Sequence, residues 1–245
     1  MRIAVVGASG RLGRATVDIL QRRDHEVRKL SRSSRSHPVD LTTGAGLDKA
    51  LREIEVVINA SNGPSSSKKA RAVLVDGTKR LLDATPAHHV CISIVGIDNL
   101  PIGAYRVKLA QEAAVRDSGR PFTILRSTQF HSLLAVPLLR VARWHVALRS
   151  RARFQPVEVV EVAGAVADIA EHAPRNGMLT IAGPEILTLT QLRAGRGLPV
   201  PVLLPPRIGH ALRSGALTIA EPDIRGKIRY THWLALNRES RGRQR

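Results

Sequence analysis

Three glycines at three-residue steps, Gly7, Gly10 and Gly13, stand between a short apolar run and an amphipathic segment near the start of the chain. N–H groups in the first turn of a helix can donate to a pyrophosphate if no side chain blocks its approach. In such a site the first glycine makes the tight turn, the second leaves room for phosphates and the third lets the helix pack closely. The pattern predicts a bound dinucleotide, with an ordinary strand-to-helix turn as the alternative. The predicted contacts are Gly7, Ser9, Gly10, Arg11, Leu12 and Gly13.

The end of the second expected strand, residues 26–30, bears on the choice between the two pyridine nucleotides. An acid at this point binds the ribose 2′-hydroxyl of NAD, whereas the 2′-phosphate of NADP needs a cation. The following residues, 31–35, contain no acid, and Arg32 beside a hydroxyl suits a phosphate. The sequence therefore favours NADP over NAD, unless these arginines belong only to a basic surface loop. Asp40 is predicted to contact the adenine ring.

Two further candidate cofactor contacts, Ala60 and Ser61, lie at the end of a strongly apolar strand predicted at 55–60. They lead into a polar loop. Ligands of open α/β sheets lie at the carboxyl ends of the strands, so both residues are predicted to face the nucleotide. His88 and His89 come soon afterwards. Adjacent side chains of a strand point to opposite faces and cannot ligate one ion together, so no metal site is expected.

The elements that would position these residues alternate as short apolar strands and amphipathic helices, which is typical of an α/β protein with a doubly wound parallel sheet, the Rossmann fold. We predict a nucleotide-binding domain at 1–150 and, at 151–245, a portion that completes the sheet and forms a small C-terminal substrate lobe. The expected strands are 3–6, 26–30, 39–41, 55–60, 90–95, 122–125, 154–159 and 178–182; the later expected helices are 47–54, 70–84, 105–118, 132–148, 162–172 and 208–217, with a broken helix hairpin at 184–198, an extended connector at 199–206 and a packed segment at 228–236.

A family resemblance rests on the order of these motifs. The glycine triad, the basic second-strand end, Asn59-Ala60-Ser61, Ser93 and the stretch from Tyr105 through Lys108 to Glu112 resemble the short-chain dehydrogenase/reductase superfamily. The sequence is most similar to the atypical, NmrA-like branch of NAD(P)-binding proteins. Segments 122–130, 154–157 and 182–185 also resemble that branch, so the likeness runs through most of the chain.

The resemblance implies a catalytic group with one departure. In typical members a tyrosine four residues before a lysine moves the proton, the lysine holds the nicotinamide ribose, and a serine orients the carbonyl. Here Ala104 occupies that position and Tyr105 stands three residues before Lys108. Three alternatives follow: Lys108 acts with Tyr105 and Ser93, Lys108 handles the proton as the main group, or Lys108 only holds the ribose and no turnover occurs.

The substrate region is expected just past the strand at 122–125. Gln129 and Phe130 are predicted to contact the substrate, with a loop that closes over the core as the alternative. The apolar helix expected at 132–148 either walls the substrate pocket or pairs with a second subunit to form a homodimer.

Composition limits the remaining classes of function. The 245 residues carry 38 basic and 20 acidic side chains, a net charge of +18, which would attract polyanions. Aromatic residues make up only 3%, so base stacking and specific nucleic-acid recognition are not expected. No membrane span is expected, because the most apolar stretches are short or interrupted by Arg140, Arg143 and Arg149. No removable signal peptide is expected, because a strand begins right after Met1. The single cysteine fits a reducing cytoplasm.

The function that the sequence predicts is NADP(H)-dependent hydride transfer to a small carbonyl, quinone or activated alkene. The alternative is a regulatory protein that senses NAD(P) without turnover, as in the NmrA-like group, and the missing tyrosine favours it. A third class is a polyanion-binding module that depends on the positive charge.

Overall fold

β1 (Arg2–Val6) lies inside a parallel sheet, between β2 (Glu26–Leu30) and β3 (Val56–Asn59). Ile3, Ala4 and Val5 are fully buried because helices cover both faces of the strand. This computed structural model describes residues 1–63, 67–142, 146–192 and 198–242. Within those ranges one sheet has seven strands in the order β11-β8-β5-β4-β3-β1-β2, which confirms the predicted Rossmann class. The other strands are β4 (His88–Ile94), β5 (Phe122–Ser127), β8 (Gly177–Ala182) and β11 (Ile224–Arg225).

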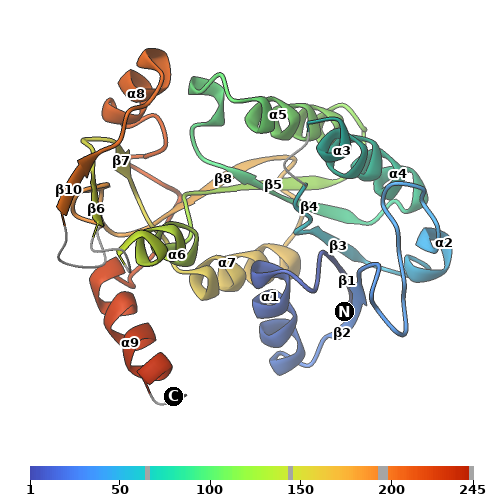
Figure 1. Ribbon diagram of the computed structural model, residues 1–245. Helices are drawn as coiled ribbons and strands as arrows, with labels where there is room; N and C mark the ends of the chain where they lie inside the picture. The colour runs from blue at the N-terminus through green and yellow to red at the C-terminus, as the bar shows by residue number, and fades with distance from the viewer. Residues whose placement is uncertain (64–66, 143–145, 193–197, 243–245) are drawn as a thin grey trace. The chain divides into compact units, whose positions relative to one another are not determined.

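Helices lie on both faces of the sheet, as Figure 1 shows for the part around β1, β3 and β4. Arg23, directly after α1, holds α1 to α7 on one face through ion pairs of 2.8 Å with Asp168 and Glu171. On the other face a continuous helical stretch includes a π-helical turn, η1, and packs against α5. The bounds are α1 (Arg11–Arg22), α2 (Leu47–Ala50), α3 (Ser67–Arg71), η1 (Ala72–Asp76), α4 (Gly77–Ala84), α5 (Gly103–Arg116) and α7 (Val159–Glu171), and a 3₁₀ turn, η2, spans Ile97–Asn99.

The chain gathers into two compact units, each built from separate stretches. Unit 1 comprises Met1–Ser93, Pro101–Arg126 and Val162–Leu179, and unit 2 comprises Ile94–Leu100, Ser127–Glu161 and Thr180–Arg245. Unit 1 contains the glycine turn and the helices just described. Unit 2 has its own core of Ala135, Leu138, Leu192, Tyr230 and Leu234, and its elements include α6 (His131–Ala142), β6 (Val146–Arg149), β7 (Arg153–Phe154), β9 (Leu187–Thr188), β10 (Leu198–Pro201), α8 (Pro206–Arg213) and α9 (Tyr230–Gly242).

The strand expected at 39–41 does not form, and β2 is therefore the edge of the sheet. Only an isolated bridge between Ser31 and Pro38 continues the pairing beyond β2. Pro38 has no backbone N–H to extend a ladder. The carboxylate of Asp40 then accepts the backbone N–H of Thr42 at 2.8 Å, which bends the chain into a turn.

Several expected elements after residue 130 were also wrong. The strand expected at 154–159 is limited to β7, because α7 already begins at Val159. The helix expected at 132–148 ends at Ala142, and 146–149 forms strand β6 instead. The helix hairpin expected at 184–198 contains β9 in its described part, while 193–197 lie outside the described residues. The connector expected at 199–206 begins as β10, where prolines are tolerated because only one neighbour pairs with the strand.

In unit 1, the helix expected at 47–54 is only one turn long and stops at Ala50. Glu53 shortly afterwards has a left-handed backbone with φ of 60°, which no α-helix continues. None of the helices in the described ranges is long and apolar enough to cross a membrane.

Candidate nucleotide-binding site

The turn between β1 and α1 depends on two of its glycines for steric reasons. Gly7 has φ of +76°, and a Cβ at this residue would lie 2.8 Å from the carbonyl oxygen of Ala60 at the end of β3. A Cβ at Gly13 would lie 2.2 Å from the carbonyl oxygen of Gly7. Gly7 therefore permits the turn, and Gly13 permits α1 to pack directly on it.

Gly10 plays a different part, since a Cβ there would meet only the Gly7 oxygen, at 3.2 Å. Gly10 is the N-cap of α1, and its own N–H donates to the carbonyl of Gly7 at 2.9 Å. It brings no side-chain cap to the helix. The first turn of α1 therefore opens without a capping side chain, which is the arrangement that an anion at a helix N-terminus requires.

A cleft of about 360 Å³ lies over this turn, at the carboxyl ends of β1, β2 and β3. Seven predicted cofactor contacts line it: Gly7, Ser9, Gly10, Arg32, Asp40, Ala60 and Ser61. Arg11, Leu12, Gly13 and Lys108 are not among its lining residues, and their cofactor contacts stay a prediction. Ser31, Ser33, Thr42 and Asn62 also line the cleft and were not among the predicted contacts, although their positions just after expected strands were a usable signal.

Opposite charges share one wall of the cleft. The backbone N–H and hydroxyl of Thr42, and then the nearby Arg32 and Arg80 side chains, hold the pKa of Asp40 below its ordinary value. Asp40 is therefore a carboxylate at neutral pH, and the exposed Arg32 lies close enough to interact with it. The wall offers a cation for a phosphate and an acid for a hydroxyl, so the two pyridine nucleotides remain open on this geometry.

Lys108, on α5, points into the interior of unit 1. Its ammonium donates to the carbonyl oxygen of Ile92 at 2.6 Å and to Oε1 of Gln111 at 2.8 Å. Burial lowers the pKa of Lys108, while the Cys91 thiol and the Glu112 carboxylate nearby raise it. Two of the three N–H donors of the ammonium are thus used by the protein itself.

The other two predicted catalytic residues also lie in unit 1. Ser93 is the last residue of β4 that belongs to unit 1. It is 2% exposed, and its Oγ has no hydrogen-bond partner within the described ranges. Tyr105 is partly buried in the first turn of α5, and burial raises the pKa of its phenol. The tyrosine is therefore protonated at neutral pH and able to donate, but the catalytic group itself stays a prediction.

Gln129 and Phe130 belong to unit 2, between β5 and α6. The Gln129 side chain is buried, with Nε2 at 3.5 Å from the carbonyl of Leu217, and its Oε1 has no partner among the described residues. The backbone of Phe130 pairs with Val157 in an isolated bridge. The predicted substrate contacts stay a prediction.

His88 and His89 hold separate partners on the two faces of β4. Nε2 of His88 lies 2.9 Å from Oγ1 of Thr123, and Nε2 of His89 lies 3.3 Å from the carbonyl of Thr85. Burial lowers the pKa of His89 to about 4. In the described part of the chain no group of three or more histidine, cysteine and acidic side chains is arranged to hold a metal ion.

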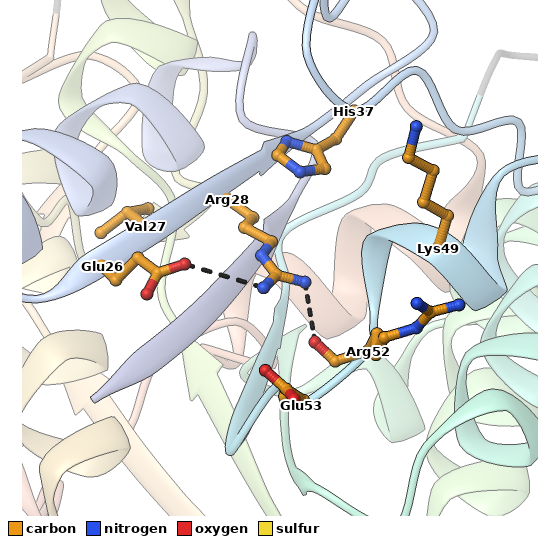
Figure 2. Close-up of a pocket in the computed structure, with 7 residues that line it drawn as sticks. All are labelled: Glu26, Val27, Arg28, His37, Lys49, Arg52 and Glu53. Carbon is orange, nitrogen blue, oxygen red and sulfur yellow. Dashed lines mark hydrogen bonds and ion pairs between the residues drawn. The ribbon is translucent and has the colours of Figure 1, made fainter.

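A second hollow of about 410 Å³ lies in unit 1 beside the first half of β2, and Figure 2 shows Arg28 at its centre. The Arg28 guanidinium donates to the carbonyl oxygens of Arg52 at 2.8 Å and Ala50 at 3.2 Å. It also lies 3.7 Å from Glu26. Arg28 thus caps one carbonyl at the end of α2 and one just after it, which is a structural role.

Comparisons with known proteins identify a family model and a relative that match this chain. The NAD(P)H-binding family model matches residues 7–133. A (4-alkanoyl-5-oxo-2,5-dihydrofuran-3-yl)methyl phosphate reductase from Streptomyces griseus is 28% identical over 211 residues, covering 78% of this chain and 71% of the reductase.

Two solved structures show the same fold. The NADPH-dependent quinone oxidoreductase of Escherichia coli, complexed with NADPH, has a TM-score of 0.80 and 16% identity over 96% of this chain and 99% of its own. The triphenylmethane reductase of Citrobacter sp., complexed with NADP(H), has a TM-score of 0.78 and 17% identity over 97% of this chain and 99% of its own. The family match covers more than half of the chain, so the chain belongs to the NAD(P)H-binding family, and the two reductases that share its fold agree with the predicted resemblance.

Proposed function

We propose that this protein is an NADP(H)-dependent reductase that transfers hydride to a small carbonyl, quinone or activated alkene. The observation that carries the proposal is the cleft over the β1–α1 turn. The backbone of Gly7 and Gly10 and the cation Arg32 line this same cleft. The nicotinamide, when bound, supplies the hydride. The residues of the cleft hold and orient the nucleotide.

The chemistry of the residues that line the cleft fits a bound NADP(H). The uncapped first turn of α1 offers N–H donors for a pyrophosphate, and Ser9 adds a hydroxyl beside it. Arg32 neutralises the extra phosphate of NADP, which a carboxylate alone would repel. Asp40, in the same wall, is the group that would favour NAD if Arg32 turned away.

For the proton we propose Tyr105, Lys108 and Ser93. Tyr105 is protonated and stands in the first turn of α5, and the buried Ser93 hydroxyl has spare hydrogen-bonding capacity. Lys108 contributes positive charge, or holds the ribose, as the family resemblance implies. Gln129 and Phe130, with the lobe at 151–245, are proposed to contact the substrate.

The test is an assay of NADPH oxidation, followed by the absorbance of the reduced nicotinamide, with a panel of quinones, aldehydes and activated alkenes. The quinone and triphenylmethane reductases share the fold, which supports these acceptors. Lys108→Ala is expected to lose turnover while nucleotide binding is retained. Unchanged turnover in this variant would remove Lys108 from the proposed catalytic group.

A second candidate is a regulatory protein that senses NAD(P) without turning it over, as in the NmrA-like group. Two observations favour it: Ala104 stands four residues before Lys108, and the Lys108 ammonium is engaged by Ile92 and Gln111. This candidate predicts different affinities for the oxidised and reduced nucleotide, with no NADPH oxidation for any acceptor of the panel. We also propose a cytoplasmic location. The proposed homodimer is tested by measuring the mass of the protein in solution.

A further inference from the structure

A buried chain of hydrogen bonds runs behind the cleft from α5 to the end of β3. It joins Lys108, Gln111 and Thr78 to Asn59, and Asn59 to Ser61. The first four side chains are 8% exposed or less, whereas Ser61 is partly exposed and lines the cleft. All five residues belong to unit 1.

The direction of each bond follows from the chemistry at the two ends. The Lys108 ammonium can only donate, so Gln111 must face it with Oε1 and turn its NH₂ group to Oγ1 of Thr78, at 3.0 Å. At the other end the backbone N–H of Ser61 can also only donate. It lies 3.2 Å from Oδ1 of Asn59, which leaves the NH₂ group of Asn59 to donate to Thr78, at 3.0 Å.

Both ends therefore give one consistent pattern. Thr78 Oγ1 accepts from the amides of Gln111 and Asn59 and uses both of its lone pairs in doing so. Oδ1 of Asn59 accepts twice from Ser61: from the backbone N–H at 3.2 Å and from the hydroxyl at 2.6 Å. The single proton of the Ser61 hydroxyl is thereby committed to Asn59.

We propose that Asn59, held by this chain, is a positioning residue that makes the Ser61 hydroxyl a hydrogen-bond acceptor at the cleft. With its proton committed, Ser61 Oγ offers only lone pairs to a ligand. It therefore takes a hydroxyl or amino group, such as those of a nucleoside, and disfavours a phosphate, which is itself an acceptor at neutral pH. The inference rests on the proposed nucleotide site and assigns Ser61 to its nucleoside part.

The test competes three probes against NADPH: adenosine, nicotinamide riboside and inorganic pyrophosphate. Ser61→Ala is expected to raise the inhibition constant of at least one nucleoside about two- to tenfold, as the loss of one neutral hydrogen bond should. The constant for pyrophosphate is expected to stay unchanged. Equal effects on nucleosides and pyrophosphate, or no effect on either nucleoside, would overturn the inference.

A double-mutant cycle tests the role of Asn59. In Asn59→Leu the Ser61 hydroxyl is free to rotate, so the affinity for the nucleoside should fall, the affinity for pyrophosphate should not, and adding Ser61→Ala should cost less than it does alone. Ser33→Ala, a hydroxyl of the same cleft outside the chain, is the matched control and should combine additively with Asn59→Leu. Additive behaviour of Asn59→Leu with Ser61→Ala would overturn the role of Asn59.

Failure of the two proposals is distinguishable. Wild-type protein that takes up neither NADPH nor NADH overturns the nucleotide site, and the assignment of Ser61 with it. Wild-type protein that binds NADPH, with Ser61→Ala equally weak for all three probes, overturns only the assignment of Ser61. Ser61→Ala, a small change at a partly exposed residue, keeps the test available if Asn59→Leu fails to fold.

Discussion

The Cα atom of Gly13 faces the carbonyl of Gly7 so closely that an added Cβ would lie 2.2 Å from the Gly7 oxygen. The start of α1 thus presses on the turn that leaves β1, with no room for any side chain between them. The turn and the helix are therefore packed backbone against backbone beneath the cleft.

We first predict that Gly13→Ala and Gly10→Ala fail in different ways. Gly13→Ala must shift backbone and should lower the free energy of unfolding by about 1–3 kcal/mol or more. Gly10 has ordinary extended backbone, with a Cβ contact of 3.2 Å, so Gly10→Ala should fold normally. Its methyl group would stand where phosphates approach, so NADPH affinity should fall about tenfold or more. Urea unfolding and calorimetric titration measure the two effects; full NADPH affinity in Gly10→Ala would place the phosphates elsewhere.

The second prediction concerns Arg32. Arg32→Ala should weaken NADPH binding about 10- to 100-fold, the loss of one or two charge-assisted hydrogen bonds, and leave NADH binding nearly unchanged. Arg35→Ala is the matched control, because Arg35 is an exposed arginine of the same loop that does not line the cleft. Calorimetric titration of both variants with NADPH and with NADH measures these affinities. Equal losses of affinity for NADPH and NADH in Arg32→Ala would contradict selection by a phosphate contact.

The third prediction concerns the buried carboxylate of Glu112, which is 0% exposed. Arg126 donates to it twice, from Nε at 2.8 Å and from Nη2 at 2.7 Å. Arg126→Met would leave this charge poorly compensated and should lower the free energy of unfolding by about 3–5 kcal/mol. The double change Arg126→Met with Glu112→Gln should recover much of that loss in urea unfolding. Arg116→Met, at a longer and more exposed contact of 3.4 Å, should cost less than about 1 kcal/mol.

The fourth prediction concerns pH. Burial lowers the pKa of His89 from 6.5 to about 4, so the unfolded chain takes up a proton before the folded chain does. The free energy of unfolding should therefore fall by about 1.4 kcal/mol per pH unit as the pH drops from 6.5 towards 4, and should be insensitive to His89 above 6.5. His89→Gln, which keeps a donor for the Thr85 carbonyl, should flatten this dependence in urea unfolding measured at pH 7, 6 and 5. A parallel dependence in the variant and the wild type would count against His89 as the source.

Much of the fold was predictable because its signals are local. The apolar runs at 3–6 and 56–58 must be buried on both faces, and the glycine spacing from Gly7 to Gly13 requires a turn that a helix follows at once. These patterns predicted seven of the sixteen residues that line the cleft, including Arg32 and Ser61. The elements after residue 130 were less predictable, since short apolar segments suit a strand or a helix equally well until partners are known.

What the sequence determined by itself is a parallel sheet with a glycine turn for a nucleotide, since backbone sterics and the burial of apolar runs act between near neighbours. Only the tertiary structure decided that β2 is an edge strand, that Lys108 points at Ile92 and Gln111, and that Asn59 holds the Ser61 hydroxyl. These outcomes depend on hydrogen bonds between residues far apart in the chain. The direction of such bonds is set by which donors and acceptors the packed helices bring together.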